Sequence, residues 1–292
     1  MDLASQFPSL VSKQVPLGEL SCFRVGGSAE MFARPRTRED LVALIKASNA
    51  AGIPWKVLGG GSNILIPDEG VAGLVIELSD PTFQKVSIDK TRATLGGGLS
   101  LADAISTTCQ AGLSGLEVLV GVPGTVGGAI CKNAGGKSGD IGPFVHSVEL
   151  VDSTGSIETR PRSLLRFGYR SSNLDDGIII SAAVDLLHEN PDDLVRRIKK
   201  IWIERQGHQP DPTENAGYVF RNPRGMSAAE LIDKAGLRGT KVGKAELSHR
   251  DPCYIVALPG ASSRDVRQLI ELVLARVEEE TTFQLELQVD LW

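Results

Sequence analysis

The stretches GVPGTVGGAICKNAGG, residues 121–136, and LGGGSN, residues 58–63, decide the fold. Each concentrates glycine after a segment whose apolar pattern indicates a strand or a helix. Consecutive glycines allow several backbone N–H groups to approach one anion, because no Cβ atom blocks the approach. Ser62, Asn63 and Thr125 add side-chain donors. Two such stretches on separate units favour a long ligand with a diphosphate, whereas one alone suits an ordinary tight turn equally well.

The familiar nucleotide-binding motifs do not account for these glycines. The segment GGKS at 135–138 resembles the end of a P-loop, but that motif requires a glycine where Cys131 stands and a helix directly after it. The GxGxxG pattern of dinucleotide-binding folds fails at its last position both at 59–64 and at 96–101. The sequence therefore supports neither a P-loop kinase nor an ordinary NAD-binding fold.

Apolar periodicity predicts helices and strands along the whole chain. Helices are expected at residues 37–53, 100–112, 193–207, 227–237 and 262–280, with Thr37, Ser100 and Ser262 or Ser263 as N-caps. Strands are expected at residues 31–35, 54–63, 73–78, 177–187, 253–258 and 284–292. Residues 85–98 alternate like a pair of strands, and residues 147–160 have the pattern of a hairpin. The strand–helix–strand order of the first 78 residues favours a parallel strand pair.

The stretch ENAGYVFRNP, residues 214–223, is expected to be an irregular loop between a proline-broken segment and a helix. It brings together the polar groups of Asn215, Arg221 and Asn222, with Tyr218 among them. The composition changes before this loop, at HENPDD, residues 188–193, and we place a domain boundary there.

Composition and charge exclude several classes of protein. The chain has 292 residues, of which 41% are hydrophobic and 23% charged, as in ordinary globular proteins with two or three compact units. A formal net charge of −5 offers no broad basic field for nucleic acid or for an anionic membrane. No apolar run approaches the roughly 20 residues of a membrane helix, and the N-terminus lacks the pattern of a signal peptide.

Cysteine and histidine usage points to a reducing compartment without a metal centre. The four cysteines and four histidines are far apart, with no CxxC pair and no HExxH motif. Neither a disulfide framework nor a metal site is expected, and a cytoplasmic protein fits best. We expect a monomer.

Taken together, these stretches resemble the UDP-N-acetylenolpyruvoylglucosamine reductase family, flavoenzymes of peptidoglycan precursor synthesis. The resemblance runs over most of the chain in the same order and spacing. It is carried by FRVGGSAEMFARP (23–35), VLGGGSNILIPDEGVAGLVIEL (57–78), GLSGLEVLVGVPGTVGGAICKNAGG (112–136), FGYRSS (167–172), NAGYVFRNP (215–223) and AAELIDKAGLRG (228–239). The direct passage from FGYRSS to the next apolar strand resembles the shorter, type II-like subtype of the family.

The resemblance implies an α+β fold: an FAD-binding domain of the vanillyl-alcohol-oxidase type with two α+β lobes, followed by a smaller α+β substrate domain. It places the FAD-binding domain at residues 1–188, with lobes at about 1–78 and 79–188, and the substrate-binding domain at 189–292. The implied FAD-binding residues are Gly59, Gly60, Gly61, Ser62, Asn63, Gly121, Pro123, Gly124, Thr125, Gly127, Gly128 and Asn133. Because no histidine falls in these stretches, the FAD is expected to be non-covalent.

The family's reaction implies roles for a few further residues. NADPH reduces the FAD, a hydride then passes to an enolpyruvyl double bond on a UDP-sugar, and an acid protonates the neighbouring carbon. Arg170 matches the arginine that polarises the substrate carboxylate, and Arg221 with Asn222 matches the pair that faces the UDP group. A guanidinium suits a diphosphate because its N–H groups match the spacing of phosphate oxygens. The alternative for Arg170 is an ordinary surface salt bridge.

Two catalytic positions depart from the family pattern. Tyr218 stands where the family has the Ser or Cys that donates the proton, and Gln288 stands where it has a Glu. A phenol can act as an acid, but its oxygen lies further from the backbone than a serine hydroxyl, and the ring can instead simply fill the site. Gln cannot exchange a proton as a carboxyl group does. The match to the family pattern could be shifted by one or two residues, which would place Glu286 at the catalytic position. This alternative stays open. Residues 248–258 depart as well, with Asp251 and Cys253 at polar positions of the family.

Three hypotheses follow. The chain is a reductase of UDP-N-acetylglucosamine enolpyruvate in which Tyr218 replaces the usual acid. Alternatively, it is an FAD oxidoreductase for a different nucleotide-linked substrate. In the third hypothesis it binds flavin but lacks the family's chemistry.

Overall fold

The computed structural model describes residues 3–211 and 214–292, which form two compact units. Unit 1 contains the described residues up to Gln14 together with residues 30–60 and 72–203, and unit 2 contains residues 15–29, 61–71 and 204–292. The sequence predicts an FAD-binding domain at 1–188 and a substrate-binding domain at 189–292. These domains are defined by function and not by compactness, so they remain predictions. No helix in the described part of the chain is long and apolar enough to span a membrane.

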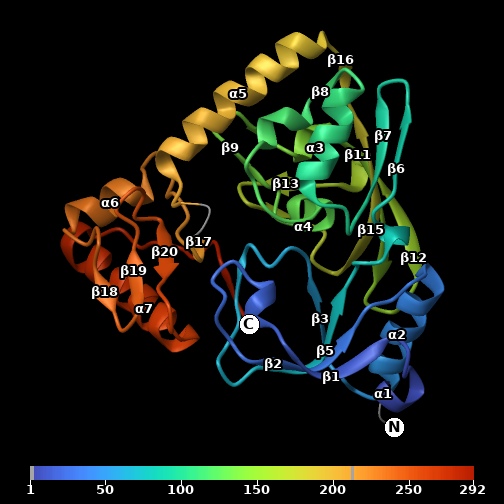
Figure 1. The fold of residues 1–292 in the computed structure, drawn as a ribbon, viewed down its shortest axis with the longest axis horizontal. Helices are drawn as coiled ribbons and strands as arrows, with labels where there is room; N and C mark the ends of the chain where they lie inside the picture. Colours follow the sequence, from blue (N-terminus) through green and yellow to red (C-terminus); the bar gives the residue numbers. More distant parts are fainter. Residues whose placement is uncertain (1–2, 212–213) are drawn as a thin grey trace. The chain divides into compact units, whose positions relative to one another are not determined.

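The first sheet has the strand order β1-β2-β5-β3. Its strands are β1 (Val11–Pro16), β2 (Ser28–Ala33), β3 (Trp55–Leu58) and β5 (Val71–Glu77), and α2 (Arg38–Ala50) packs against it (Figure 1). β3 and β5 pair in parallel, whereas β2 and β3, the two strands that flank α2 in the chain, are separated by β5 and do not form the expected pair. The Thr37 hydroxyl accepts a hydrogen bond from the Asp40 N–H at 3.1 Å, so α2 begins with the predicted cap.

The second sheet is antiparallel, with the order β12-β11-β15-β7-β6. Its strands are β6 (Val86–Asp89), β7 (Arg92–Gly96), β11 (Val145–Asp152), β12 (Ile157–Pro161) and β15 (Gly177–Asp185). Helices α3 (Leu101–Gln110) and α4 (Val126–Cys131) bury Ile105 and Ile130 against Leu95 and Val184 of this sheet. The predicted strand pair, hairpin and Ser100 cap are confirmed.

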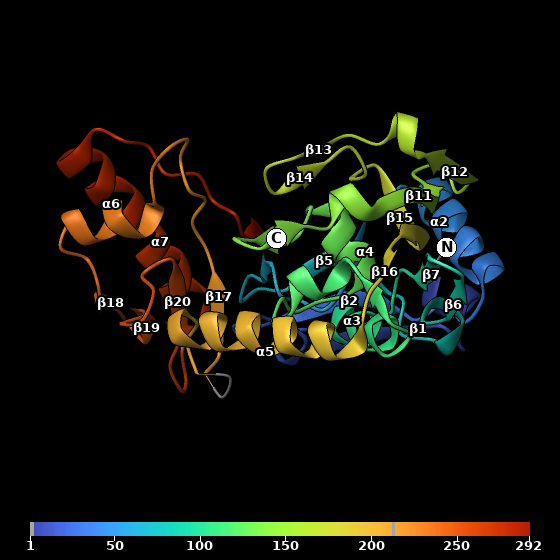
Figure 2. The ribbon, with the colours of Figure 1, turned by 90° about the horizontal axis from the view of Figure 1, so that it is seen from above.

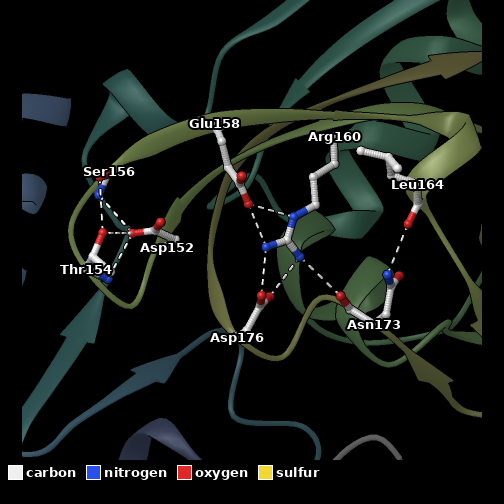
Figure 3. A network of polar contacts seen from close by, with 8 residues as sticks. All are labelled: Asp152, Thr154, Ser156, Glu158, Arg160, Leu164, Asn173 and Asp176. Carbon is white, nitrogen blue, oxygen red and sulfur yellow. Dashed lines mark hydrogen bonds and ion pairs between the residues drawn. The ribbon is translucent and has the colours of Figure 1, made fainter.

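The β11–β12 hairpin is fastened by two sets of polar contacts (Figure 3). In the turn, the Asp152 carboxylate accepts hydrogen bonds from the N–H groups of Thr154 and Ser156 at 2.8 and 2.9 Å. On β12, the guanidinium of Arg160 donates two bonds to Asp176 at 2.8 and 2.7 Å, and another to Glu158. The fork geometry fixes the segment after residue 173 against the hairpin.

Helix α5 (Pro191–His208) follows, as one uninterrupted helix (Figure 2). In its first half, Arg197 forms an ion pair with Glu117, whose side chain is only 2% exposed, and a second with Glu189. The Glu117 carboxylate also accepts a hydrogen bond from the Gly115 N–H. A buried carboxylate needs such partners, so this cluster fixes α5 to the segment that leads into residues 121–128.

Unit 2 contains a sheet of order β17-β20-β19-β18 and two helices. The strands are β17 (Ala216–Tyr218), β18 (Lys241–Val242), β19 (Ala245–Leu247) and β20 (Tyr254–Ala257), with α6 (Ala228–Lys234) and α7 (Ser263–Thr281). Ser262 caps α7, one of the two predicted candidates. The Asp68 carboxylate accepts hydrogen bonds from the first two N–H groups of α7, at 2.8 and 3.0 Å.

Short elements complete the described chain. They are α1 (Leu3–Gln6), η1 (Gly18–Leu20), β4 (Ile64–Leu65), η2 (Pro81–Phe83), β8 (Leu113–Ser114), η3 (Leu116–Leu119), β9 (Gly135–Gly136), β10 (Gly139–Asp140), η4 (Gly142–Phe144), η5 (Arg162–Leu164), β13 (Phe167–Gly168), β14 (Ser171–Ser172), β16 (Leu187–His188) and β21 (Asp290–Leu291).

Two sequence-based expectations were wrong. Within 214–223, residues 216–218 form β17, because their backbone pairs in register with β20 rather than remaining irregular. The C-terminal strand expected over 284–292 is reduced to β21, which pairs in parallel with β4. Residues 286–288 instead make a single antiparallel bridge, between Leu287 and Phe220. Both errors concern pairing between segments far apart in the chain. Alternating polarity does not show which distant segment a strand will pair with.

We predict that the Arg160–Asp176 pair contributes stability at neutral pH that is lost in acid. Hydrogen bonds from Arg160 hold the pKa of Asp176 below its ordinary value. A carboxyl group with a lowered folded-state pKa contributes above its unfolded pKa, about 4, and the contribution disappears as the pH falls through the folded pKa. Asp176→Asn should lower the free energy of unfolding at pH 7 by a few tenths to about 1 kcal/mol, the range for exposed pairs.

Urea unfolding at pH 7 and at pH 3 measures this loss. The variant should differ from the wild type less at pH 3 than at pH 7. Asp175→Asn, at the neighbouring exposed aspartate, is the matched control and should leave both values unchanged. An equal loss at both pH values would contradict an ionic contribution.

Candidate functional site

The two glycine stretches touch one another through their backbones in unit 1. A Cβ atom on Gly60 would lie 2.6 Å from the Cα atom of Gly124, and one on Gly59 would lie 2.9 Å from the Thr125 hydroxyl oxygen. Gly124 also has a φ of +117°, which favours glycine. No side chain fits between the stretches, so their main chains are in direct contact.

The contact leaves backbone donors without protein acceptors. The N–H groups of Gly59, Gly60 and Gly124 donate no hydrogen bond to any residue in the described part of the chain. Three N–H groups on two adjoining loops, with no Cβ atoms between them, can bind phosphate oxygens. These residues therefore fit the diphosphate of a dinucleotide such as FAD.

The second stretch is shaped by the turn into α4. Gly121 and Pro123 lie in the turn between η3 and α4. The Thr125 hydroxyl accepts a hydrogen bond from the Gly128 N–H at 3.3 Å, and the Gly127 N–H donates to the Gly97 carbonyl at 2.8 Å. The predicted residues of this stretch thus set the path of the loop. The Thr125 side chain is already bonded to the first turn of α4.

A third run of glycines contributes to the same loop, although the sequence analysis did not assign it to the site. Any side chain on Gly96, Gly97 or Gly98 would overlap with backbone carbonyl groups of neighbouring segments. The carbonyl of Gly97 then receives the N–H of Gly127. Three consecutive glycines directly after a predicted strand were the signal that could have identified this support.

The end of the first stretch belongs to unit 2. Gly61, with φ +62°, packs so closely on the Leu20 carbonyl that a side chain would overlap with it. The Asn63 side-chain amide donates to the Gln288 carbonyl at 3.0 Å. The Cys22 thiol donates to the Ser62 carbonyl at 3.6 Å, and burial raises the pKa of this thiol to about 12. Asn63 therefore fixes the loop to the C-terminal segment.

Asn133 ties together three segments of unit 1. Its side chain is buried, donating to the Gly168 carbonyl at 2.7 Å and accepting from the Gly142 N–H at 3.0 Å. Both ends of the amide are thus occupied by the protein. Asn133 can shape the surroundings of a cofactor, while its side chain is committed to the backbone.

Arg170 lies at the tip of the β13–β14 hairpin and is held over the loop that follows Asn133. Its guanidinium donates to the carbonyl groups of Asn133 and Gly135, at 3.3 and 2.8 Å, and to Asp140 at 2.9 Å. The side chain is only 16% exposed, so it is not an ordinary surface ion pair. A guanidinium has five N–H groups, and these three bonds leave two for a ligand.

Tyr218 is held by its strand partners in unit 2. β17 and β20 pair Tyr218 with Tyr254, and the two rings meet edge to face with centroids 5.0 Å apart. Burial raises the pKa of the Cys253 thiol to about 12, and the Tyr218 side chain acts on that thiol in the opposite direction. On the neighbouring face of β17, a side chain on Gly217 would overlap with the ring of Phe23. The position of the Tyr218 ring is therefore fixed by packing.

Arg221 and Gln288 lie on the two segments that the bridge between Phe220 and Leu287 joins. The bridge between Phe220 and Leu287 sets Arg221 opposite Glu286, with 3.6 Å between their charged groups. The Nε atom of Arg221 and the Oε1 atom of Gln288 are both buried without a partner among the described residues. Glu286, by contrast, is 78% exposed, so Gln288 is the residue directed inward.

Asn222 has a structural contact that the sequence did not indicate. Its side-chain oxygen accepts a hydrogen bond from the Ala228 N–H, the first of α6, at 2.9 Å. Its side-chain NH2 group makes no hydrogen bond within the described residues, so a donor remains for a ligand.

Comparison with known proteins agrees with these features. Residues 29–160 match a family described as an FAD binding domain, and residues 209–292 match the C-terminal domain of UDP-N-acetylenolpyruvoylglucosamine reductase. A protein of that name from Heliobacterium modesticaldum is 36% identical over 280 residues, which cover 95% of this chain and 89% of the relative.

Solved structures extend the comparison to the fold. The crystal structure of UDP-N-acetylenolpyruvylglucosamine reductase from Thermus caldophilus matches with a TM-score of 0.83 at 35% identity, covering 96% of this chain and 98% of that one. Phl p 4.0202, a glucose dehydrogenase, matches in fold alone, with a TM-score of 0.50 at 17% identity over 63% of this chain and 42% of that one. The predicted α+β fold with an FAD-binding domain of the vanillyl-alcohol-oxidase type is confirmed. On the sequence identity and the extent of the match, the chain belongs to the UDP-N-acetylenolpyruvoylglucosamine reductase family.

Proposed function

We propose that this protein is an FAD-dependent reductase that uses NADPH to convert UDP-N-acetylglucosamine enolpyruvate to UDP-N-acetylmuramate in peptidoglycan precursor synthesis. The observation that carries the proposal is the adjoining pair of glycine loops with three free N–H groups at Gly59, Gly60 and Gly124. Because residues 29–160 match an FAD binding domain and the chain belongs to this reductase family, the proposed ligand of the two loops is the diphosphate of FAD.

Bound FAD would supply the chemistry of hydride transfer between NADPH and the substrate. In the proposal, the three free N–H groups hold the FAD diphosphate. The remaining predicted residues are proposed to shape the two loops: Gly61, Ser62, Asn63, Gly121, Pro123, Thr125, Gly127, Gly128 and Asn133. This division follows from the hydrogen bonds that Asn63, Thr125 and Asn133 already make within the protein.

Arg170 is proposed to bind the substrate carboxylate with its two remaining N–H groups. Its position is set in advance by the bonds to Asn133, Gly135 and Asp140, so little reorganisation is needed when charge develops on the substrate. Arg221 and Asn222 are proposed to contact the diphosphate of the UDP group, since each retains a donor with no acceptor among residues 3–211 and 214–292.

Tyr218 is proposed to donate the proton, and Gln288 to orient the substrate through a hydrogen bond. The buried Oε1 atom of Gln288 lacks a donor, which a ligand could supply. An amide cannot exchange a proton, so Tyr218 must act without a neighbouring carboxyl group at residue 288.

One observation favours a second candidate function. The Tyr218 ring is packed edge to face against Tyr254, and two catalytic positions differ from the family pattern. An FAD oxidoreductase for another nucleotide-linked substrate, or a flavin-binding protein without the reductase chemistry, would retain the glycine loops and lose the proton donor.

We further propose that the protein works as a monomer in the cytoplasm. No disulfide is formed among the cysteines of the described residues, which suits a reducing compartment.

The first prediction from this proposal concerns Gly60. Gly60→Ala would place a methyl group 2.6 Å from the Gly124 Cα atom and force the two loops apart. We expect the dissociation constant for FAD to rise at least about tenfold, because overpacking costs roughly 1–3 kcal/mol. Fluorescence titration of the flavin-free protein with FAD measures it. Gly207→Ala, where a Cβ meets nothing within 4 Å, should bind FAD as the wild type does.

The function itself is tested with the purified wild-type protein. A bound-flavin absorbance spectrum is expected, and NADPH oxidation should accelerate when the enolpyruvyl sugar nucleotide is added. Flavin reduction by NADPH without substrate turnover would instead support the alternatives. Absence of flavin binding would contradict all of them.

Arg170→Lys should lower kcat about 100-fold or more, because a lysine cannot reproduce the fork that holds the carboxylate. Reduction of the flavin by NADPH in the absence of substrate should be unaffected, as measured by stopped-flow absorbance. Arg166→Lys is the control, since Arg166 is an exposed arginine four residues earlier. A kcat near the wild-type value for Arg170→Lys would contradict the proposed role.

The double variant Tyr218→Ser, Gln288→Glu restores the side chains that the family pattern has. We expect kcat for the enolpyruvyl substrate to rise at least about tenfold, as general acid–base groups commonly contribute 100-fold or more. Steady-state kinetics of both single variants and the double variant measure it. No gain in any of them would show that other parts of the substrate site limit turnover.

A further inference from the structure

Asn63, the last residue of the first glycine stretch, holds the main chain around Gln288 in unit 2. Its side-chain NH2 group donates to the Gln288 carbonyl at 3.0 Å. Its own carbonyl accepts from the Asp290 N–H at 2.9 Å, two residues further along the same segment. One residue of the glycine stretch thus fixes the C-terminal segment at two points.

These two bonds begin a longer contact between the same parts of the chain. Directly after them, β4 pairs in parallel with β21. The Trp292 N–H donates to the Leu65 carbonyl at 3.0 Å. Leu65 and Val289 are both buried and belong to one hydrophobic core. The residues that follow Asn63 therefore lie beside those that follow Gln288.

The main chain of Gln288 is also bonded to the segment that carries Tyr218. The Gln288 N–H donates to the carbonyl of Val219, the residue after Tyr218, at 2.7 Å. Both backbone polar groups of Gln288 are therefore occupied, one by Val219 and the other by the Asn63 side chain. Its side-chain Oε1 atom is buried and has no partner among residues 3–211 and 214–292. A fixed main chain with an unsatisfied side-chain acceptor suits a residue that orients a ligand.

The glycine stretch leads into Asn63 through a fixed turn. The Gly61 carbonyl accepts from the Cys22 N–H at 3.0 Å, and a side chain on Gly61 would overlap with the backbone of residues 20–21. Gly60, whose N–H group has no acceptor in the described part of the chain, directly precedes Gly61. An anion that restrains the main chain at Gly60 therefore acts only three residues away from Asn63.

We infer that Asn63 is a positioning residue that couples the glycine loop to Gln288. The inference rests on the proposed function, in which this loop holds the FAD diphosphate and Gln288 orients the substrate. An anion bound to the loop restrains its main chain, and the Asn63 amide transmits this restraint to the Gln288 carbonyl. Occupation of the loop therefore stabilises the position from which Gln288 acts. Such a coupling between two sites is reciprocal.

Hydrogen exchange of the full-length protein measures the coupling without any substrate. The amides of residues 288, 290 and 292 are all hydrogen-bonded, so they report on the C-terminal segment. In the wild type, saturating FAD should slow their exchange about fivefold or more, the lower end of typical couplings. In flavin-free Asn63→Ala, they should exchange about three- to tenfold faster than in the wild type, the equivalent of one lost hydrogen bond. The additional slowing by FAD should disappear in this variant.

Two controls show that the effect is local. The amides of β19 and β20, in the sheet of the same unit, report on unfolding of unit 2 and should exchange as in the wild type. Asn49→Ala is the matched variant, because Asn49 also donates to a distant carbonyl, that of Ser153 at 2.7 Å. It lies on α2 in unit 1 and should leave the C-terminal amides unchanged.

Asn63→Asp separates hydrogen bonding from packing. The aspartate has the same shape as the asparagine, but it presents an acceptor oxygen to the Gln288 carbonyl in place of the NH2 donor. We therefore expect this variant to be at least as impaired as Asn63→Ala.

Kinetics with saturating FAD test the consequence for the reaction. Asn63→Ala should slow reduction of the enolpyruvyl substrate about three- to tenfold, while reduction of the flavin by NADPH stays at the wild-type rate. A merely structural role would slow both half-reactions or neither.

Wild-type exchange of the C-terminal amides in Asn63→Ala would overturn the inference, as would wild-type behaviour of Asn63→Asp. So would equal slowing by FAD in the wild type and in Asn63→Ala, because the coupling would then not pass through the Asn63 side chain. If the wild type bound FAD but did not reduce the enolpyruvyl substrate, the proposed function would fail. The exchange measurement would still decide whether Asn63 couples the loop to Gln288.

Discussion

The contact between the main chains of Gly60 and Gly124 is the constraint on which the cofactor half of the structure depends. At this distance, any Cβ atom would separate the two loops. The supporting elements maintain the contact: β3 delivers the first loop, η3 and α4 bracket the second, and the Glu117–Arg197 ion pair fixes the segment before it. The approach leaves the N–H groups of Gly59, Gly60 and Gly124 without acceptors in the described part of the chain. An anion bound there would accept their hydrogen bonds.

Much of this half was predictable from the sequence, because its signals are local. Capping residues such as Thr37 and Ser100 mark helix starts, and the spacing of apolar residues shows which face is buried. The glycine stretches were predictable as an anion site since the chemistry resides in the backbone. The sequence did not show that the side chains of Asn63 and Asn133 are hydrogen-bonded within the protein, because their partners lie far away in the chain.

The substrate half was less predictable, because its important contacts join residues far apart in the chain. The irregular loop expected around Tyr218 is a strand because β20, some 35 residues later, supplies its partner. The expected C-terminal strand is short because its backbone bonds are shared between Phe220 and β4. Pattern rules detect alternation but not the identity of the pairing strand, so the direction of the Tyr218 hydroxyl could not be inferred beforehand.

This contrast offers a physical reason why the departures from the family pattern fall in one half only. A site made of main-chain contacts admits glycine and nothing else, so a single replacement there disrupts the whole surface. A site made of side chains can accept a larger residue if its neighbours change with it. Tyr218 has such a neighbour in Tyr254, which provides a packing surface. Gln288 has no comparable partner for its buried oxygen, and a ligand donor is the remaining way to satisfy that atom.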